Sequence, residues 1–281
     1  MNNTDSKITP LAAARQDKDL PTRQQAILDL AHQGGFVATE QLVRHFGVTP
    51  QTIRRDINTL CDLKLLQRYH GGAGLPSSVE NAPYADRQGQ SPDAKQRIAA
   101  LTAGLIPNYA SLFINIGTTT EAVAKALVGH EGLRVVTNNI NVAQILRENP
   151  SFEIILAGGT VRNRDGGIIG AAAIEFIRGF RLDYAVIGIS GIDADGSLLD
   201  FDLREVQVAR AIIDSSNHVL LGADESKFGR RAMVRLGDLS DVQSLITSAA
   251  PPAPFMPAIT GAGIDLIYDD RSAAAALAED G

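Results

Sequence analysis

The sequence predicts an α/β protein in which a small winged helix-turn-helix domain precedes a larger domain with a mostly parallel sheet. Two observations support this fold class. Residues 24–73 carry three short helical patterns and then a hairpin pattern around a Gly-Gly turn. From Asp93 onward, apolar strand patterns alternate with helical patterns, which favours parallel strands joined by helices. The chain of 281 residues is long enough for one small and one mid-sized domain.

Composition predicts the domain boundaries. The first twenty residues are polar and small, and the stretch after the hairpin holds three prolines, several serines and little apolar periodicity. The expected parts are a flexible extension over 1–20, the small domain over 21–75, a linker over 76–92, the larger domain over 93–270 and a tail over 271–281.

Residues 49–58 have the pattern of a short helix suited to nucleic acid. Thr49 can cap this helix with its hydroxyl, and Pro50 fits the first turn, where a missing N–H costs nothing. The apolar positions recur at helical spacing and form one stripe: Ile53, Ile57 and Leu60. Side chains that can read base edges and neutralise phosphates lie on or beside the opposite face, namely Gln51, Thr52, Arg54, Arg55 and Asn58.

The flanking segments complete a winged helix-turn-helix. A helical pattern over 39–46 is followed by a Gly-containing turn, and a third helix before it can close a small core. Residues 65–73 have the pattern of two short strands, which places Arg68 and His70 on a wing beside the DNA backbone. The alternative is an incidental helix-turn-helix pattern whose arginines form a solvated face.

Charge is distributed unevenly along the chain. Residues 22–76 hold six Lys or Arg and four Asp or Glu, so this segment carries +2, whereas the whole chain carries −6 and the remainder therefore −8. The total charge does not indicate a nucleic-acid partner. The local balance supports the helix-turn-helix motif without being evidence by itself.

The segment 24–73 resembles the DNA-binding domain of DeoR-family bacterial repressors. The matching phrases are Thr39-Glu40-Gln41-Leu42, Val48-Thr49-Pro50-Gln51-Thr52-Ile53-Arg54-Arg55-Asp56 and Arg68-Tyr69-His70-Gly71-Gly72-Ala73. The resemblance continues through most of the chain, with further phrases at 136–139, 156–159, 164–170, 188–193 and 226–230. It implies a repressor that binds double-stranded operator DNA, with Thr39 and Thr49 among its DNA-binding residues.

The larger domain is expected to contain these elements in order. Strands are predicted at 111–116, 133–137, 152–157, 183–189 and 218–223, with edge strands at 242–247 and 264–268. Helices are predicted at 93–106, directly after 117–120, at 140–147 and at 204–214. In open parallel sheets, ligands bind just beyond the carboxyl ends of the strands. The polar residues that follow five predicted strands form one candidate cleft: Gly117, Thr118, Thr119, Thr120, Asn138, Asn139, Gly158, Gly159, Arg162, Ser190, Gly191, Asp224 and Lys227.

The loop 117–120 is the expected phosphate site within this cleft. Glycine lets backbone N–H groups approach an anion, hydroxyls add donors, and the start of a helix favours negative charge. Lys227 can pair with the same anion, and Asp224 can accept hydrogen bonds from ligand hydroxyls. The alternatives are a capped helix start without a ligand and a surface ion pair.

The family resemblance adds an expectation about the ligand. DeoR-family sensor domains resemble ribose-5-phosphate isomerases, and their effectors are mostly phosphorylated sugars or polyols. The resemblance therefore implies that the Asp-x-x-Lys pair and the Gly-Thr-Thr loop bind the effector, and the closer likeness within the family points to glycerol 3-phosphate. One departure is Asn115, where the family often has Asp; an amide brings no charge there.

The residues predict a repressor that leaves its operator when a small phosphorylated polyol binds, and not an enzyme, and the resemblance implies that it controls glycerol 3-phosphate metabolism genes. Two alternatives remain open: an isomerase-like enzyme fused to a DNA-binding module, in which Asp224, Lys227 and Asp193 move protons, and a DeoR-family repressor that answers to another sugar phosphate. A redox sensor for dinucleotides is disfavoured because the glycine fingerprint is absent. No cofactor or metal is expected, since the five histidines are scattered.

The remaining expectations concern compartment and assembly. Cys61 is the single cysteine and is interpreted as a packing residue rather than a redox sensor, which fits a reducing compartment. The sequence contains no apolar run of membrane-spanning length and no signal-peptide core, so we expect a cytoplasmic protein without a membrane partner. Because one winged helix buries little surface, a homo-oligomer, dimer or tetramer, is expected.

Overall fold

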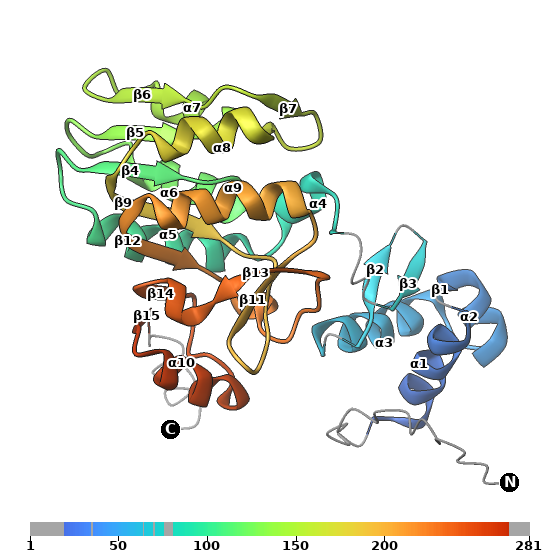
Figure 1. Ribbon diagram of the computed structural model, residues 1–281. Helices are drawn as coiled ribbons and strands as arrows, with labels where there is room; N and C mark the ends of the chain where they lie inside the picture. Colours follow the sequence, from blue (N-terminus) through green and yellow to red (C-terminus); the bar gives the residue numbers. More distant parts are fainter. Residues whose placement is uncertain (1–19, 35, 64, 70, 76–80, 270–281) are drawn as a thin grey trace, which may run out of the picture. The chain divides into compact units, whose positions relative to one another are not determined.

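The computed structural model describes residues 20–34, 36–63, 65–69, 71–75 and 81–269 (Figure 1). The chain divides into two compact units, Met1–Pro76 and Ser77–Gly281. Each unit has a hydrophobic core of its own. Apart from Leu20, the expected extension over 1–20 lies outside the described residues, as does the expected tail over 271–281.

The described residues of the first unit form three helices and a three-stranded antiparallel sheet of order β1-β3-β2. The elements are α1 (Thr22–Gly34), β1 (Phe36–Ala38), α2 (Thr39–Phe46), α3 (Pro50–Asp62), β2 (Gln67–Tyr69) and β3 (Gly72–Gly74). The predicted winged helix-turn-helix is confirmed. Strand β1 was not predicted, because three residues are too few to show an alternating pattern.

Two local signals determine the turn between α2 and α3. Gly47 adopts a left-handed φ of 64°, which suits glycine, and its N–H donates to the Val43 carbonyl at 3.0 Å. Thr49 then caps α3, since its hydroxyl accepts from the backbone N–H of Thr52 at 3.3 Å, and Pro50 is the first helical residue. The predicted cap is therefore present.

Helix α3 packs into the core of the first unit through the predicted stripe, because Ile53, Ile57 and Leu60 are buried. Asp56 lies buried on the same helix. Its carboxylate accepts hydrogen bonds from Arg23 Nε at 2.5 Å and from Gln24 Nε2 at 3.1 Å. A buried carboxylate is stable only when it is paired, so these bonds fasten α3 to α1.

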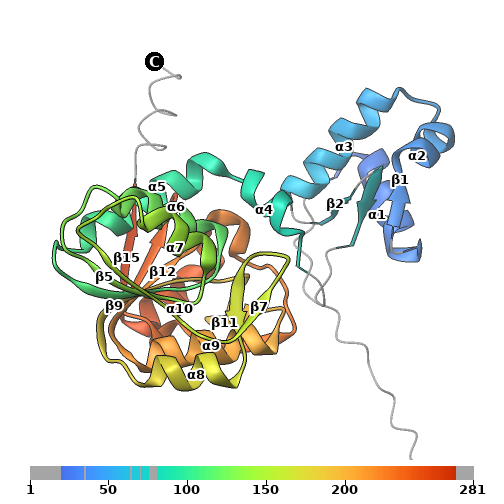
Figure 2. The same ribbon diagram turned by 90° about the horizontal axis from the view of Figure 1, so that it is seen from above.

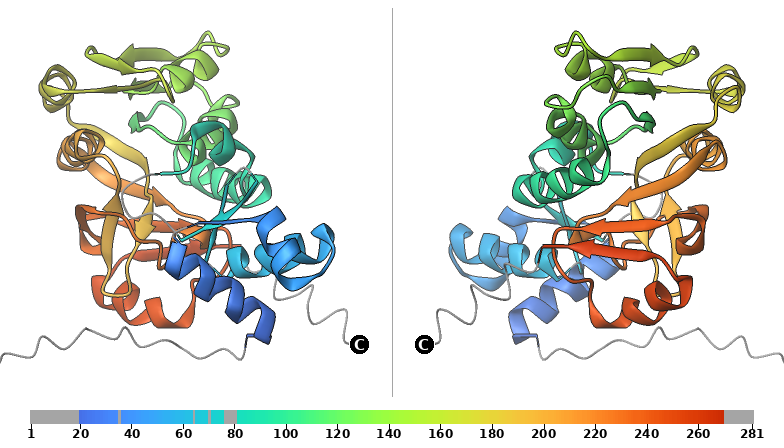
Figure 3. Two further views of the ribbon diagram at one scale, coloured as in Figure 1. Left: turned by 90° about the vertical axis from the view of Figure 1, so that its right-hand side faces the viewer. Right: turned by 90° about the vertical axis from the view of Figure 1, so that its left-hand side faces the viewer.

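The second unit is built on a seven-stranded sheet of order β15-β14-β12-β9-β4-β5-β6 (Figure 1). Figure 3 shows the same ribbon from two further sides. All neighbouring strands run parallel, which confirms the predicted sheet. The strands are β4 (Ser111–Ile114), β5 (Arg134–Thr137), β6 (Glu153–Leu156), β9 (Leu182–Gly188), β12 (Ser216–Gly222), β14 (Ser244–Thr247) and β15 (Asp265–Tyr268).

Helices cover both faces of this sheet (Figure 2). One face packs against α5 (Pro92–Leu105), α6 (Thr118–Leu127) and α7 (Ile140–Leu146), and the other against α8 (Ala171–Arg178) and α9 (Leu203–Asp214). Successive side chains of β4 alternate between these faces: Leu112 and Ile114 lie in the core beneath α5, α6 and α7, and Phe113 lies in the core beneath α8 and α9. Burial on both faces explains why these strands read as continuous apolar runs.

Several smaller elements of the second unit were not predicted, because their short segments carry weak periodic signals. They are the hairpin β7 (Thr160–Arg162) and β8 (Gly167–Ile169), the sheet of β10 (Gly191–Ile192), β11 (Ser197–Asp200) and β13 (Val234–Asp238), the helices α8 and α10 (Met256–Ala262), and the 3-10 turns η1 (Glu225–Lys227), η2 (Leu239–Asp241) and η3 (Ala253–Phe255).

The predicted linker over 76–92 needs correction, because part of it is an ordered portion of the second unit. It contains helix α4 (Tyr84–Gly89). The Tyr84 hydroxyl donates to Glu121 Oε2 at 2.7 Å, and Arg87 lies 3.7 Å from Asp165. Polar contacts rather than an apolar stripe hold this segment, so its composition resembled that of a linker.

Candidate functional site

The face of α3 opposite the buried stripe is open to solvent. Gln51, Arg54, Arg55 and Asn58 are exposed, and Thr52 is half-buried. These amide and guanidinium groups have the donors and acceptors that recognise base edges and phosphates. The structure therefore brings the five residues predicted on this helix to one accessible surface.

The wing strand β2 contacts the end of this surface. Arg68 Nη1 donates to Asn58 Oδ1 at 2.6 Å, which joins the exposed side of α3 to the wing. Thr49 is exposed at the start of α3, and Thr39 is half-buried at the start of α2. His70, also predicted to touch DNA, lies outside the described residues.

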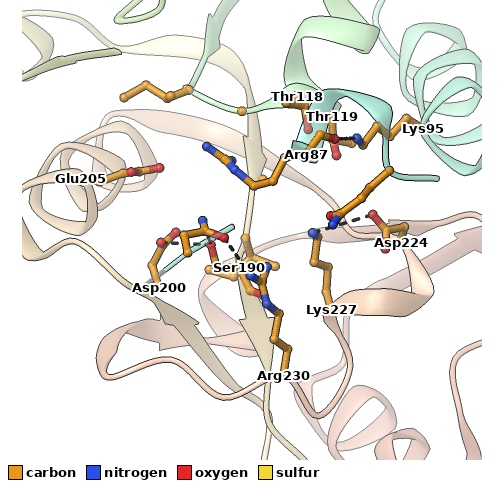
Figure 4. Close-up of a pocket in the computed structure, with 16 residues that line it drawn as sticks. Arg87, Lys95, Thr118, Thr119, Ser190, Asp200, Glu205, Asp224, Lys227 and Arg230 are labelled. Carbon is orange, nitrogen blue, oxygen red and sulfur yellow. Dashed lines mark hydrogen bonds and ion pairs between the residues drawn. The ribbon is translucent and has the colours of Figure 1, made fainter. Parts of the chain in front are cut away.

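A pocket in the second unit lies at the carboxyl ends of three neighbouring central strands, β4, β9 and β12 (Figure 4). The end of β11, the start of α9 and the chain around α4 complete its wall. The lining residues are Asn81, Arg87, Gln90, Lys95, Ile116, Gly117, Thr118, Thr119, Gly188, Ile189, Ser190, Asp200, Glu205, Asp224, Lys227 and Arg230.

Four cationic side chains, Arg87, Lys95, Lys227 and Arg230, line the pocket. Burial lowers the pKa of Lys227 to about 8, against the attraction of Asp224, whose Oδ2 lies 3.9 Å from Lys227 Nζ. Burial also lowers the pKa of Lys95 and of Arg230, and the positive charge of Arg87 acts in the same direction on both groups. Cations that are desolvated and repel one another are stabilised by an anion placed among them.

Asp224 supplies a carboxylate beside these cations. Its Oδ1 accepts from the backbone N–H of Ser226 at 2.8 Å and caps η1. Burial would raise the pKa of Asp224, but the charge of Lys227 and the hydrogen bonds from Ser226 outweigh burial and lower it. The carboxylate therefore stays ionised at neutral pH, where it can accept from a ligand hydroxyl.

Two further carboxyl groups line the pocket. Asp200 accepts from the Ser190 hydroxyl at 3.0 Å, and Glu205 accepts from Arg162 Nη2 at 2.7 Å. Burial raises the pKa of Asp200. Burial and the nearby charge of Asp200 raise the pKa of Glu205 to about 7, although Arg162 opposes the rise. The charge of this part of the pocket therefore changes near neutral pH.

Arg162 was predicted to bind the effector, but it does not line the pocket. Its guanidinium is largely buried among carboxylates: it donates twice to Asp165, at 2.8 and 2.7 Å, to Asp202 at 3.1 Å and to Glu205 at 2.7 Å. These bonds fasten β7 to the start of α9. The positive charge is already neutralised, so Arg162 stabilises the wall of the pocket rather than facing into it.

Six of the thirteen residues predicted for the cleft line the pocket. They are Gly117, Thr118, Thr119, Ser190, Asp224 and Lys227. All six follow β4, β9 or β12, which are adjacent in the sheet. The structure therefore brings these six predicted residues together where the three strand ends meet.

The other predicted residues lie outside the pocket, most of them in structural contacts of their own. The Thr120 hydroxyl donates to the Asn115 carbonyl at 2.7 Å, Asn138 Nδ2 donates to the Ile168 carbonyl, and Asn139 caps α7. Gly158 and Gly159 are exposed after the edge strand β6. Gly191 packs so closely that an added Cβ would lie 2.1 Å from the Arg230 carbonyl oxygen. The structure does not bring these residues into the pocket.

Sequence reasoning missed seven polar or charged lining residues: Asn81, Arg87, Gln90, Lys95, Asp200, Glu205 and Arg230. The first three lie in the segment interpreted as a linker. Arg230 offered a usable signal, because it follows Lys227 by three residues in the loop after β12. The acidic pair gave no such signal, since it comes from the small sheet and helix start beside the main sheet.

Two features are absent from the described residues. In the part of the chain that the structure describes, no helix is long and apolar enough to cross a membrane. The same residues contain no group of three or more His, Cys, Asp or Glu side chains that could hold a metal ion.

Two family models match this chain. The DeoR-like helix-turn-helix domain matches residues 23–79, and the DeoR C terminal sensor domain matches residues 90–249. The first match contains α3 and the wing, and the second contains all but two of the residues that line the pocket.

Curated relatives match nearly the whole chain. The glycerol-3-phosphate regulon repressor of Escherichia coli (strain K12) is 54% identical over 244 residues, which cover 87% of this chain and 97% of that protein. The protein of the same name from Haemophilus influenzae is 59% identical over 229 residues, covering 82% of this chain and 89% of that protein.

Solved structures show only a distant likeness. Ribose 5 phosphate isomerase A from Neisseria gonorrhoeae has a TM-score of 0.35 at 17% identity, covering 49% of this chain and 54% of that chain. The Pyrococcus horikoshii OT3 translation initiation factor eIF-2B has a TM-score of 0.42 at 15% identity, covering 80% of this chain and 86% of that chain.

Proposed function

Since this chain belongs to the DeoR family of DNA-binding transcriptional repressors, we propose that it represses genes of glycerol 3-phosphate metabolism. Glycerol 3-phosphate enters the pocket of the second unit and releases the repressor from its operator. The observation that carries this proposal is the pocket itself, where four cations face a helix start and a carboxylate. The names of the two curated relatives support the choice of ligand.

The effector fits the pocket by its chemistry. Its phosphate sits on the backbone N–H groups at the start of α6, from Gly117 to Thr119, which have no partner within the helix. Asp224 and Lys227 hold the other end, where Asp224 accepts from the ligand hydroxyls. A phosphorylated polyol supplies both the anion and the hydroxyl donors that this arrangement requires.

The DNA side of the proposal rests on the exposed face of α3. The residues proposed to contact the operator are Gln51, Thr52, Arg54, Arg55 and Asn58, with Thr39, Thr49, Arg68 and His70 beside the DNA backbone. Because the relatives are repressors, the chain is a regulator rather than an isomerase fused to a DNA-binding module. A sensor needs the anion site but no acid–base pair.

An operator titration tests the proposed effector. The full-length protein selects its operator from a random DNA pool, and the affinity is then measured with and without saturating glycerol 3-phosphate. A typical allosteric coupling of about 1–3 kcal/mol would lower operator affinity roughly 5- to 150-fold. Unchanged affinity contradicts this effector, and release by another phosphorylated sugar instead assigns the chain to a different sugar phosphate.

The variant Lys227→Ala tests the site separately from the ligand. Lys227 belongs to the second unit, so the variant is expected to bind the operator as the wild type does. It is expected to lose the response to glycerol 3-phosphate, because the pocket loses a cation. A wild-type response in this variant contradicts the proposed site and leaves the effector in place.

A further inference from the structure

We propose that Asn81 transmits occupancy of the effector pocket toward the DNA-binding unit, an inference that rests on the proposed function. Asn81 lines the pocket. It also lies five residues after Pro76, where the first unit ends. The chain passes only once from the first unit to the second, so a signal carried by the backbone between them passes this residue.

The side chain of Asn81 bonds two other lining residues. Its Oδ1 accepts from Arg230 Nη2 at 2.7 Å, and its Nδ2 donates to Ser190 Oγ at 3.3 Å. Ser190 in turn donates to Asp200 at 3.0 Å. The amide therefore connects the cationic and acidic parts of the pocket to the chain that leads to the DNA-binding unit.

Arg230 is suited to respond to an anion through its side chain alone. The backbone of Arg230 packs closely against Gly191 of β10, because a Cβ at position 191 would clash with the Arg230 carbonyl oxygen. The guanidinium bonds neutral oxygens, Asn81 Oδ1 and the Ser190 carbonyl at 3.4 Å, and lies over the Phe201 ring at 5.0 Å from its centroid. A phosphate is a stronger partner for guanidinium than an amide oxygen. Binding of phosphate in the pocket therefore changes the bond between Arg230 and Asn81.

The segment that follows Asn81 is held in place by hydrogen bonds within the second unit. A change in the bond between Arg230 and Asn81 is therefore resisted on that side of Asn81. Tyr84 is bonded to Glu121, Arg87 Nε donates to the Ala82 carbonyl at 3.1 Å, and Lys95 donates to the Arg87 carbonyl. Because the chain after Asn81 is anchored to the second unit, we expect a change at Asn81 to act toward the first unit rather than toward α4. Asn81 thus acts as a positioning residue whose contribution is to coupling and not to the anion site itself.

The test compares full-length wild type with Asn81→Ala and with the control Asp86→Ala, which alters an exposed residue of α4 outside the pocket wall. Operator affinity is measured with and without saturating glycerol 3-phosphate, effector affinity by calorimetry, and folding by thermal melting. Asn81→Ala is expected to fold, and at glycerol 3-phosphate concentrations that saturate the variant the effector-induced change in operator affinity becomes about 2- to 30-fold smaller. Asp86→Ala is expected to respond as the wild type does.

A second variant decides the question if Asn81→Ala does not fold. Asn81→Asp gives Arg230 an ionic partner that competes with the phosphate, so half-maximal release is expected to need more glycerol 3-phosphate. A wild-type response in the folded Asn81 variants overturns this inference and leaves the proposed function in place. Loss of effector binding by Asn81→Ala does the same, because it would make Asn81 a ligand contact. A wild type that ignores glycerol 3-phosphate overturns the proposed function and this inference together.

Discussion

Individual residues of the pocket titrate close to physiological pH. Burial lowers the pKa of Lys227 to about 8, and burial with the charge of Asp200 raises the pKa of Glu205 to about 7. Lys227 carries its charge below pH 8, whereas Glu205 becomes negative above pH 7. Rising pH therefore removes a cation and adds an anion, and both changes disfavour a negatively charged ligand.

The first prediction is that the affinity for glycerol 3-phosphate falls between pH 7 and pH 9. The ligand is already a dianion in this range, because the second pKa of a phosphate ester is about 6, so the change reports the protein. If binding requires charged Lys227, affinity is expected to be roughly tenfold lower at pH 9 than at pH 7. Calorimetry across this range checks the prediction, and Lys227→Ala, which lacks the titrating amine, should flatten the profile. Equal wild-type affinity at both ends would be inconsistent with it.

A second residue-scale prediction concerns Arg54 and Arg55. Both are exposed on α3, opposite the buried stripe. Replacing either by Ala is expected to weaken operator binding by about 1–3 kcal/mol if that arginine reads a guanine. Gel-shift titrations check this, with Lys125→Ala, an exposed change in the second unit, as control. If both folded arginine variants bind operator normally, α3 is not the recognition helix.

Among the elements, the position of α3 depends on a polar contact as well as on its apolar stripe. Asp56 accepts from Arg23 and Gln24 of α1. Burial would raise the pKa of Asp56, but these hydrogen bonds outweigh burial and lower it. A lowered carboxyl pKa means that the contact stabilises the fold fully above the unfolded pKa of about 3.9 and is lost as pH falls through the folded value.

The corresponding prediction is that Asp56→Ala destabilises the DNA-binding unit by about 1 kcal/mol or somewhat more. Removing the carboxylate leaves the Gln24 amide without its buried partner, whereas Arg23, at 38% exposure, is partly solvated and limits the cost. Hydrogen exchange of the α1 and α3 amides at pH 7 measures the effect, with exposed Asp62→Ala on the same helix as control. Unchanged protection of α1 and α3 would refute the proposed fastening.

The elements also explain which predicted site residues reach the pocket. Strands β4, β9 and β12 are neighbours at the centre of the sheet, so their following loops converge. Strands β5 and β6 lie toward the edge, and their loops contribute Asn139 as a cap of α7 and Gly159 before the β7 hairpin. Polar residues that follow a strand can therefore be assigned to a binding site only when the order of the strands in the sheet is known.

For the whole molecule, the prediction is assembly into a homo-oligomer. A single winged helix buries too little surface for a tight and specific site, and repressors of this architecture gain affinity by reading repeated half-sites. Light scattering of the full chain is expected to give a dimer or tetramer at micromolar concentration. A monomer, both with and without operator DNA, would contradict this expectation.

The sequence by itself determined the local features of this protein. Helical spacing, the possible Thr49 cap and the glycine in the turn at position 47 predicted the recognition helix and its turn, because these signals act within a few residues. Alternating strand and helix patterns predicted the parallel sheet, and the Gly-Thr-Thr loop marked one wall of the pocket. The tertiary structure decided which strand ends meet, that α4 belongs to the second unit, and that Arg87 and Arg230 join Lys227 in the pocket. Strand order and polar contacts between distant segments depend on packing across the whole domain, which no short stretch of sequence specifies.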